Sequence, residues 1–135
     1  MSGQHAGSTL RRPLGLVLAL GFVVAACGSG SGLGLDKPPA SFDPNSPTLS
    51  AKNIKFDVAD VDVPANLAFI LVFENNESVG HNVSVYADAT YRTRLFEGLV
   101  FSSSTRWYPM PSLAPGTYVF KCDVHPEMNG RLHAA

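Results

Sequence analysis

The chain has 135 residues, of which 45% are hydrophobic and 16% are charged, and its formal net charge at pH 7 is −1. A chain of this length has room for one domain and little else. The balanced charge and the lack of a basic cluster exclude a nucleic-acid-binding protein that relies on a positive surface.

The N-terminal segment has the features of a targeting sequence. Arg11 and Arg12 precede an apolar run at residues 14–24, which is too short to cross a bilayer as a helix. The run ends in Val-Ala-Ala-Cys at Cys27, which resembles the lipobox of bacterial lipoproteins. This resemblance implies that residues 1–26 are a signal peptide and that Cys27 is acylated. The arginine pair also suggests twin-arginine export, but the rest of that motif is absent, so the export route stays open.

The next segment, residues 27–50, is predicted to be the lipidated cysteine and a flexible tether, because it is rich in Gly, Ser and Pro. A tether of this length reaches on the order of 25 Å, and two or more acyl chains hold a protein stably at a bilayer. The protein is therefore expected to be exported and lipid-anchored to a membrane on its extracytoplasmic face, periplasmic or outer. Its folded domain is expected at residues 51–135.

The expected domain has a short, strand-like pattern of polar and apolar residues. The segments that carry it are residues 53–58, 66–73, 82–86, 105–108, 117–122 and 130–133. Residues 91–101 have no clear period. Several short strands with turn signals between them predict an all-β sandwich or barrel. The expected core residues are Phe56, Phe69, Leu71, Phe73, Val85, Trp107, Tyr118 and Phe120.

The most informative residues lie near the end of the chain. Cys122, His125 and Met128 follow one another at Cys-x2-His-x2-Met spacing, and His81 lies upstream beside a predicted strand. One thiolate, two imidazoles and a weak thioether are the ligands of a mononuclear blue-copper electron-transfer centre. The sulfur ligands favour Cu(I) and the imidazoles tolerate both oxidation states, so this donor set suits a redox carrier.

Two segments resemble a known family. Residues 114–130 and residues 73–83 are similar to the ligand-bearing segments of the cupredoxins, the small type 1 copper proteins that include plastocyanin and amicyanin. The spacing from His125 to Met128 is the shorter, amicyanin-like form. The resemblance implies a Greek-key β-sandwich, a cupredoxin-like copper-binding domain with one copper ion.

The same resemblance implies a role for each site residue. The copper ligands would be His81, Cys122 and His125, bound strongly in one plane, and Met128, bound weakly on the axis. Asn82 would contact the ligands rather than the copper, with its side chain joining the two ligand segments.

The function that follows is that of a membrane-anchored blue copper protein, which carries one electron at a time. The alternative is a copper-binding lipoprotein that delivers copper to an oxidase or buffers it. A copper enzyme of the nitrite-reductase or oxidase kind needs further histidines for a second copper cluster, and the chain has four in all, so no enzyme is expected.

The expected partners are a transient redox donor and acceptor, and the protein is expected to be a monomer. The expected exit for the electron is His125, with a docking patch at Leu99, Val100, Phe101 and Pro126.

Other assignments of the same residues are less consistent with the pattern. Cys27 is assigned to the lipobox, which argues against a disulfide with Cys122. A structural zinc site would need a strong fourth ligand in place of a thioether. Met110 lies outside the ligand loop and precedes a proline, which argues against it as the axial ligand, and His133 is expected to face solvent from the last strand.

Overall fold

The computed structural model of the chain describes residues 2–3 and 34–135. Within those residues the regular structure is β-sheet, and no helix there is long and apolar enough to cross a membrane. Of the predicted signal peptide only residues 2–3 are described, and Cys27 lies outside the described residues. The strands are β1 (Thr48–Ala51), β2 (Asp60–Val63), β3 (Phe69–Asn75), β4 (Ser84–Tyr86), β5 (Arg94–Glu97), β6 (Ser104–Met110), β7 (Gly116–Lys121) and β8 (Asn129–Ala134).

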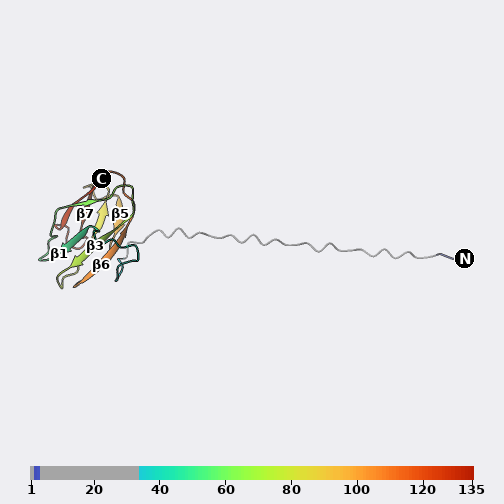
Figure 1. Ribbon diagram of the computed structural model, residues 1–135, viewed down its shortest axis with the longest axis horizontal. Helices are drawn as coiled ribbons and strands as arrows, with labels where there is room; N and C mark the ends of the chain where they lie inside the picture. Colours follow the sequence, from blue (N-terminus) through green and yellow to red (C-terminus); the bar gives the residue numbers. More distant parts are fainter. Residues whose placement is uncertain (1, 4–33) are drawn as a thin grey trace.

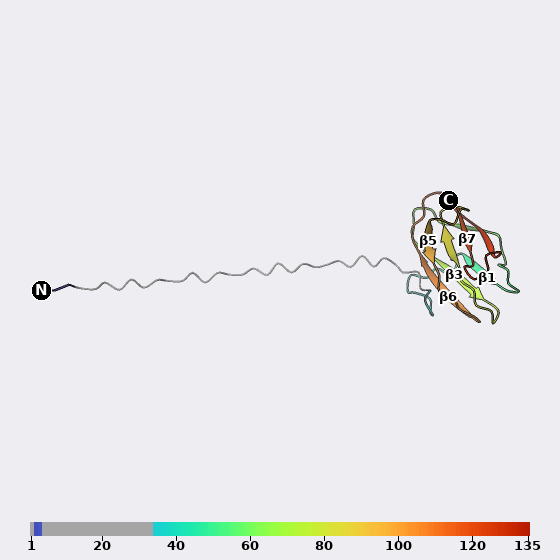
Figure 2. The same ribbon diagram turned by 180° about the vertical axis from the view of Figure 1, so that it is seen from behind.

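The eight strands form two sheets, one with the order β1-β3-β6 and one with the order β2-β8-β7-β4-β5 (Figure 1). The view from behind shows β3 and β6 side by side in the smaller sheet (Figure 2). β1 pairs with β3 and β2 with β8 in parallel, and the other neighbours are antiparallel. The all-β sandwich predicted from the strand pattern is confirmed.

The core between the sheets is built around aromatic side chains. Phe73 on β3 is 0% exposed, and its ring contacts the rings of Phe56, Phe101 and Tyr108. Of the predicted core residues, four are buried, namely Leu71, Phe73, Val85 and Phe120, and three are partly buried and pack against the core, namely Phe56, Phe69 and Tyr118. Trp107 is half-buried and does not belong to this cluster. The reason is register, because alternation on β6 turns Tyr108 inward and its neighbour outward.

Residues 53–58 do not form the predicted strand. Asn53 and Ile54 have φ angles of 56° and 55°, a left-handed conformation that cannot continue a strand. Lys52 and Lys55 close a turn around them through two backbone hydrogen bonds, and Phe56 forms only an isolated bridge with Ala51. The polar–apolar alternation there comes from a loop that turns one aromatic ring into the core.

The folded part also begins before residue 51, the boundary expected from the sequence. β1 starts at Thr48 and pairs with β3. Further upstream, Leu35 forms a bridge with Trp107 on β6, and the ring of Phe42 meets the edge of the Trp107 indole. Residues 34–50 therefore lie against the sandwich, which shortens the segment that could act as a tether.

The edge strand β2 is tied to β8 by a small charged cluster. Oδ1 of Asp60 accepts hydrogen bonds from Nε of Arg131 at 2.9 Å and from Nε2 of His133 at 2.8 Å. These hydrogen bonds, from His133 first and Arg131 second, hold the pKa of Asp60 below its ordinary value of 3.8. His133 thus lies on the surface, as the sequence suggested, and pairs with an acidic side chain on the next strand.

We expect Asp60→Asn to lower the melting temperature by a few degrees at pH 7 and by progressively less as the pH falls below about 4. The pKa of Asp60 is lower in the folded chain than in the unfolded chain. Its contribution is therefore complete above the unfolded pKa and is lost as the pH drops through the folded value. Thermal melts of the two chains at several pH values measure the difference. Asp62→Asn, on the same strand, is the control, and an equal effect of both variants at every pH would contradict the pairing.

Candidate metal centre

The predicted ligands meet at one end of the sandwich because of how two strands pair. β4 and β7 are antiparallel neighbours, with Ser84 opposite Lys121. The start of one strand therefore lies beside the end of the other. His81 comes just before β4, and Cys122 comes directly after β7, so the sheet brings the two segments together although they lie far apart in the sequence.

The loop from Cys122 to Met128 is closed by two backbone hydrogen bonds. The N–H of Cys122 donates to the carbonyl of Met128, and the N–H of Met128 donates to the carbonyl of His125, both at 2.9 Å. Pro126 restricts the backbone on either side of it. Three of the four predicted ligand residues are thus held in one tight turn.

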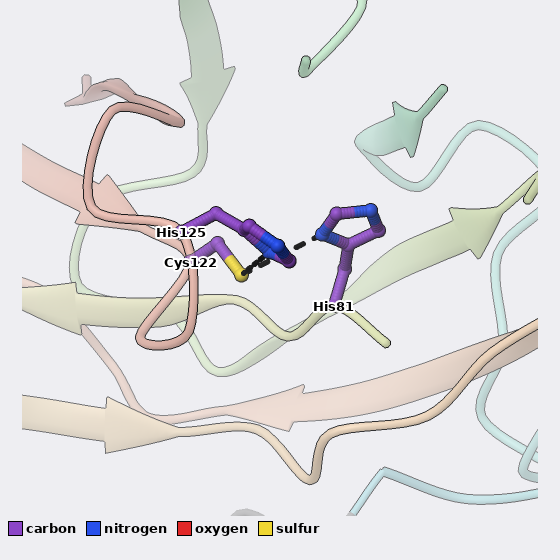
Figure 3. A group of neighbouring side chains, drawn as sticks. All are labelled: His81, Cys122 and His125. Carbon is purple, nitrogen blue, oxygen red and sulfur yellow. Dashed lines mark hydrogen bonds between the residues drawn. The ribbon is translucent and has the colours of Figure 1, made fainter. Parts of the chain in front are cut away.

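The side chains of His81, Cys122 and His125 converge, as Figure 3 shows. Their candidate donor atoms all lie within 4.8 Å of one another. Sγ of Cys122 lies 3.7 Å from Nδ1 of His81 and 3.7 Å from Nδ1 of His125. Cys122 and His81 are each 0% exposed, and His125 is half-buried.

These distances fit a metal ion bound by all three side chains. With thiolate and imidazole bonds of about 2.3 and 2.0 Å and an angle of about 120° between them, the sulfur and nitrogen would lie about 3.7 Å apart. A thiol has only one proton, so it can donate a hydrogen bond to only one of the two imidazoles. The nearly equal separations of the sulfur from the two nitrogens match those that a shared ion would give.

The two methionines considered as axial ligands lie in different places. Met128 is buried at the base of the ligand loop, with 2% exposure. Met110 is buried at the far end of β6, where it pairs with Phe69 at the start of β3. His81 follows the other end of β3, so Met110 is removed from the site, and Met128 stays the predicted axial ligand.

Asn82 is buried and bonds to both ligand segments. Its Oδ1 accepts a hydrogen bond from the backbone N–H of Asp123 at 2.8 Å. Its Nδ2 donates to the carbonyl of Gly98 and to Oδ2 of Asp123, each at 2.9 Å. The side chain that follows His81 therefore bonds twice to the residue that follows Cys122.

Asp123 is a site residue that the sequence analysis did not identify. Its carboxylate also accepts hydrogen bonds from the hydroxyls of Ser84 at 2.5 Å and Tyr86 at 2.8 Å. Burial raises the pKa of Asp123, but the hydrogen bonds from Ser84, Asn82 and Tyr86 outweigh burial, and the net shift is downward. The result is a negative charge fixed beside Cys122. The sequence signal for it was an acidic residue directly after the predicted ligand Cys122.

Glu77 is the second residue that was missed. Its carboxylate accepts hydrogen bonds from the backbone N–H of Ile54 and from the outer nitrogen of His81. The hydrogen bond from Ile54 lowers the pKa of Glu77 most, burial opposes it, and the hydrogen bond with His81 adds to the lowering. Glu77 thus lies behind His81, on the side away from Cys122.

The surface around the site is apolar. Leu99, Val100 and Val124 are each 44–50% exposed, and the first two line a shallow hollow with Asn82 and Asp123. Phe101, expected in the same patch, is instead half-buried and pairs through its backbone with His81. We call Leu99, Val100 and Val124 the apolar rim.

Three comparisons with known proteins bear on this arrangement. A family model described as a cupredoxin-like domain matches residues 17–134. Amicyanin from Paracoccus versutus (Thiobacillus versutus) is 20% identical, and the alignment covers 75% of this chain and 93% of that chain with a TM-score of 0.56. Auracyanin A, a "blue" copper protein from the green thermophilic photosynthetic bacterium Chloroflexus aurantiacus, is 19% identical over 65% of this chain and 96% of that chain, with a TM-score of 0.56. The search among curated protein sequences finds no significant match. At such identities the two structures establish a likeness of fold.

Proposed function

This chain belongs to the cupredoxin-like family, and on that premise we propose that it carries single electrons through one copper ion. His81, Cys122 and His125 would hold the copper strongly, and Met128 would be a weaker fourth ligand. The observation that supports this assignment best is the position of the Cys122 sulfur, 3.7 Å from a nitrogen of each histidine.

The bound copper would supply the redox chemistry by alternating between Cu(I) and Cu(II). The residues around it supply a frame that changes little between the two states. Cys122 is fixed by its backbone hydrogen bond to Met128, and the Asn82–Asp123 pair fixes the two ligand segments to each other. Small rearrangement is what fast electron transfer requires of a site with this donor set.

The electron would leave through His125. Of the three side chains that converge at the site, His125 is half-buried, whereas His81 and Cys122 are buried. The apolar rim of Leu99, Val100 and Val124 would provide the docking surface. Redox partners meet through small and short-lived interfaces, and three exposed apolar side chains suit brief contact with more than one donor or acceptor.

We expect copper-loaded protein to exchange electrons rapidly between its own oxidised and reduced copies, and Val100→Asp to slow this exchange about tenfold at low salt. Two copies must bring their rims together, so the variant places like charges opposite each other. NMR line broadening in mixtures of the two redox states measures the rate. Leu67→Asp is the control, because Leu67 is exposed at the other end of the sandwich.

The rival function, copper delivery or buffering, predicts the opposite pattern. A delivery protein would lose Cu(I) quickly to a chelator and exchange electrons slowly, with no effect of Val100→Asp. The burial of Cys122 and His81 at 0% exposure favours the carrier, because copper held there is shielded from competing ligands.

We further propose that the protein is exported and anchored through Cys27 to the extracytoplasmic face of a membrane. The basic pair, the apolar run and the Val-Ala-Ala-Cys sequence support this proposal. Detergent-dependent release of the protein from a membrane fraction is the expected result, and recovery in the soluble fraction would contradict the anchor.

A further inference from the structure

The buried ring of His81 uses both of its nitrogens. Nδ1 faces the Cys122 sulfur, and Nε2 lies 2.7 Å from Oε1 of Glu77. The side chain of His81 is 0% exposed and that of Glu77 is 17% exposed. A carboxylate can only accept a hydrogen bond, so this contact requires the proton of His81 to be on Nε2. Nδ1 is then left with a lone pair directed at the sulfur.

A strained turn holds the same carboxylate oxygen. Oε1 of Glu77 also accepts a hydrogen bond from the backbone N–H of Ile54 at 2.9 Å. Ile54 has a φ of 55°, which is costly for a β-branched residue. Such strain persists only where the surroundings enforce it and is common at functional sites. Here the unusual backbone points an N–H at Glu77.

We infer that Glu77 is a positioning residue, which fixes the tautomer and the orientation of His81 so that Nδ1 is ready to bind the metal. The use of Nδ1 by copper rests on the proposed function, whereas the fixing of the ring by Glu77 does not. A carboxylate that hydrogen-bonds the outer nitrogen of a histidine ligand keeps the ring oriented and makes it more basic.

The other histidine is held differently. Among the residues that the structure describes, the ring of His125 has a hydrogen-bond contact only with Cys122. The His81 ring is thus held through Nε2 by the carboxylate of Glu77. The His125 ring is half-buried, and its Nε2 has no hydrogen-bond partner among the described residues. The fixed ring would preserve the site when the exposed one is disturbed by a docking partner.

Long-range proton–nitrogen NMR on the metal-free full chain tests the inference without copper. We expect His81 to carry its proton on Nε2 in the unaltered chain and in Glu77→Gln, whose amide oxygen can still accept the hydrogen bond. Glu77→Ala should give a mixture of tautomers. Glu74→Gln is the matched control, because it removes the same charge from a residue of β3 that has no hydrogen bond to a predicted ligand among the described residues, and it should leave the tautomer unchanged.

Copper titration supplies the second readout. We expect Glu77→Ala to weaken Cu(II) binding about 10- to 100-fold and Glu77→Gln to weaken it less, with Glu74→Gln unchanged. If Glu77→Ala does not fold, Glu77→Leu, which has a similar size and cannot accept a hydrogen bond, takes its place, and Cu(II) binding by that variant as tight as by Glu74→Gln overturns the inference. So does a proton on Nδ1 of His81 in the unaltered chain. A tautomer that depends on Glu77 in a chain that binds no copper would support the positioning role and contradict the proposed function instead.

Discussion

Copper-loaded Cys122→Ser is expected to lose nearly all of the intense visible absorption of the unaltered chain while it remains folded. The band requires charge transfer from a thiolate to Cu(II), and a serine hydroxyl at neutral pH supplies neither the negative charge nor the soft donor atom. Cys122 is 0% exposed between two imidazoles. Serine is close to cysteine in size and can hydrogen-bond to either ring, so the fold should survive the substitution.

Visible and electron paramagnetic resonance spectra after addition of Cu(II) measure this effect. The unaltered chain should give a strong band with narrow hyperfine splitting, and the serine variant should give the weak colour of ordinary Cu(II). Met128→Leu is the control, because loss of a weak axial ligand should shift the spectrum without abolishing the band. A serine variant that stays intensely coloured would show that Cys122 is not the ligand. An unaltered chain that binds one copper without the band would favour copper delivery.

Phe73→Ala is expected to lower the free energy of unfolding by about 3–5 kcal/mol. Phe73 is 0% exposed, and three aromatic rings surround it. Small domains have total stabilities of about 5–15 kcal/mol, so this single cavity would remove much of the margin. One of the three rings is that of Phe101, whose backbone pairs with His81, so the metal centre should weaken along with the core.

Urea denaturation of the metal-free chain, followed by tyrosine and tryptophan fluorescence, measures the loss. Leu67→Ala is the control. Leu67 is 61% exposed, and surface substitutions usually change stability by no more than about 0.5 kcal/mol. A loss below about 1 kcal/mol in Phe73→Ala would mean that the core closes around the missing ring and that the aromatic cluster is not its main support.

The sequence predicted the structure best where that structure depends on residues close together in the sequence. The ligand loop lies within one turn, so the spacing of Cys122, His125 and Met128 could be recognised directly. The long apolar run predicted β3, although the strand begins at Phe69, later than expected. In contrast, β1 and β2 are short edge strands whose pairing in parallel is a property of the assembled sheet. Nothing in four residues alone distinguishes such a strand from a loop.

The contacts behind the ligands could not be predicted because they join distant parts of the chain. Asp123 bonds to Asn82, and Glu77 bonds to Ile54. Each pair becomes adjacent only after the sheets have formed. The left-handed backbone at Ile54 is also contrary to the preference of its own side chain. The wrong strand prediction for residues 53–58 and the missed role of Glu77 therefore have the same cause. The turn at Ile54 is hydrogen-bonded to Glu77, which lies outside that segment.

The bridge between Leu35 and Trp107 sets how far the protein could travel from a lipid at Cys27. Position 35 is eight residue steps after position 27, and even a fully extended chain of that length spans only about 28 Å. A domain held so closely would search for its partners in two dimensions, by gliding along the membrane. It would then serve redox proteins embedded in or bound to that same surface, and its encounter rates would depend on their lateral density.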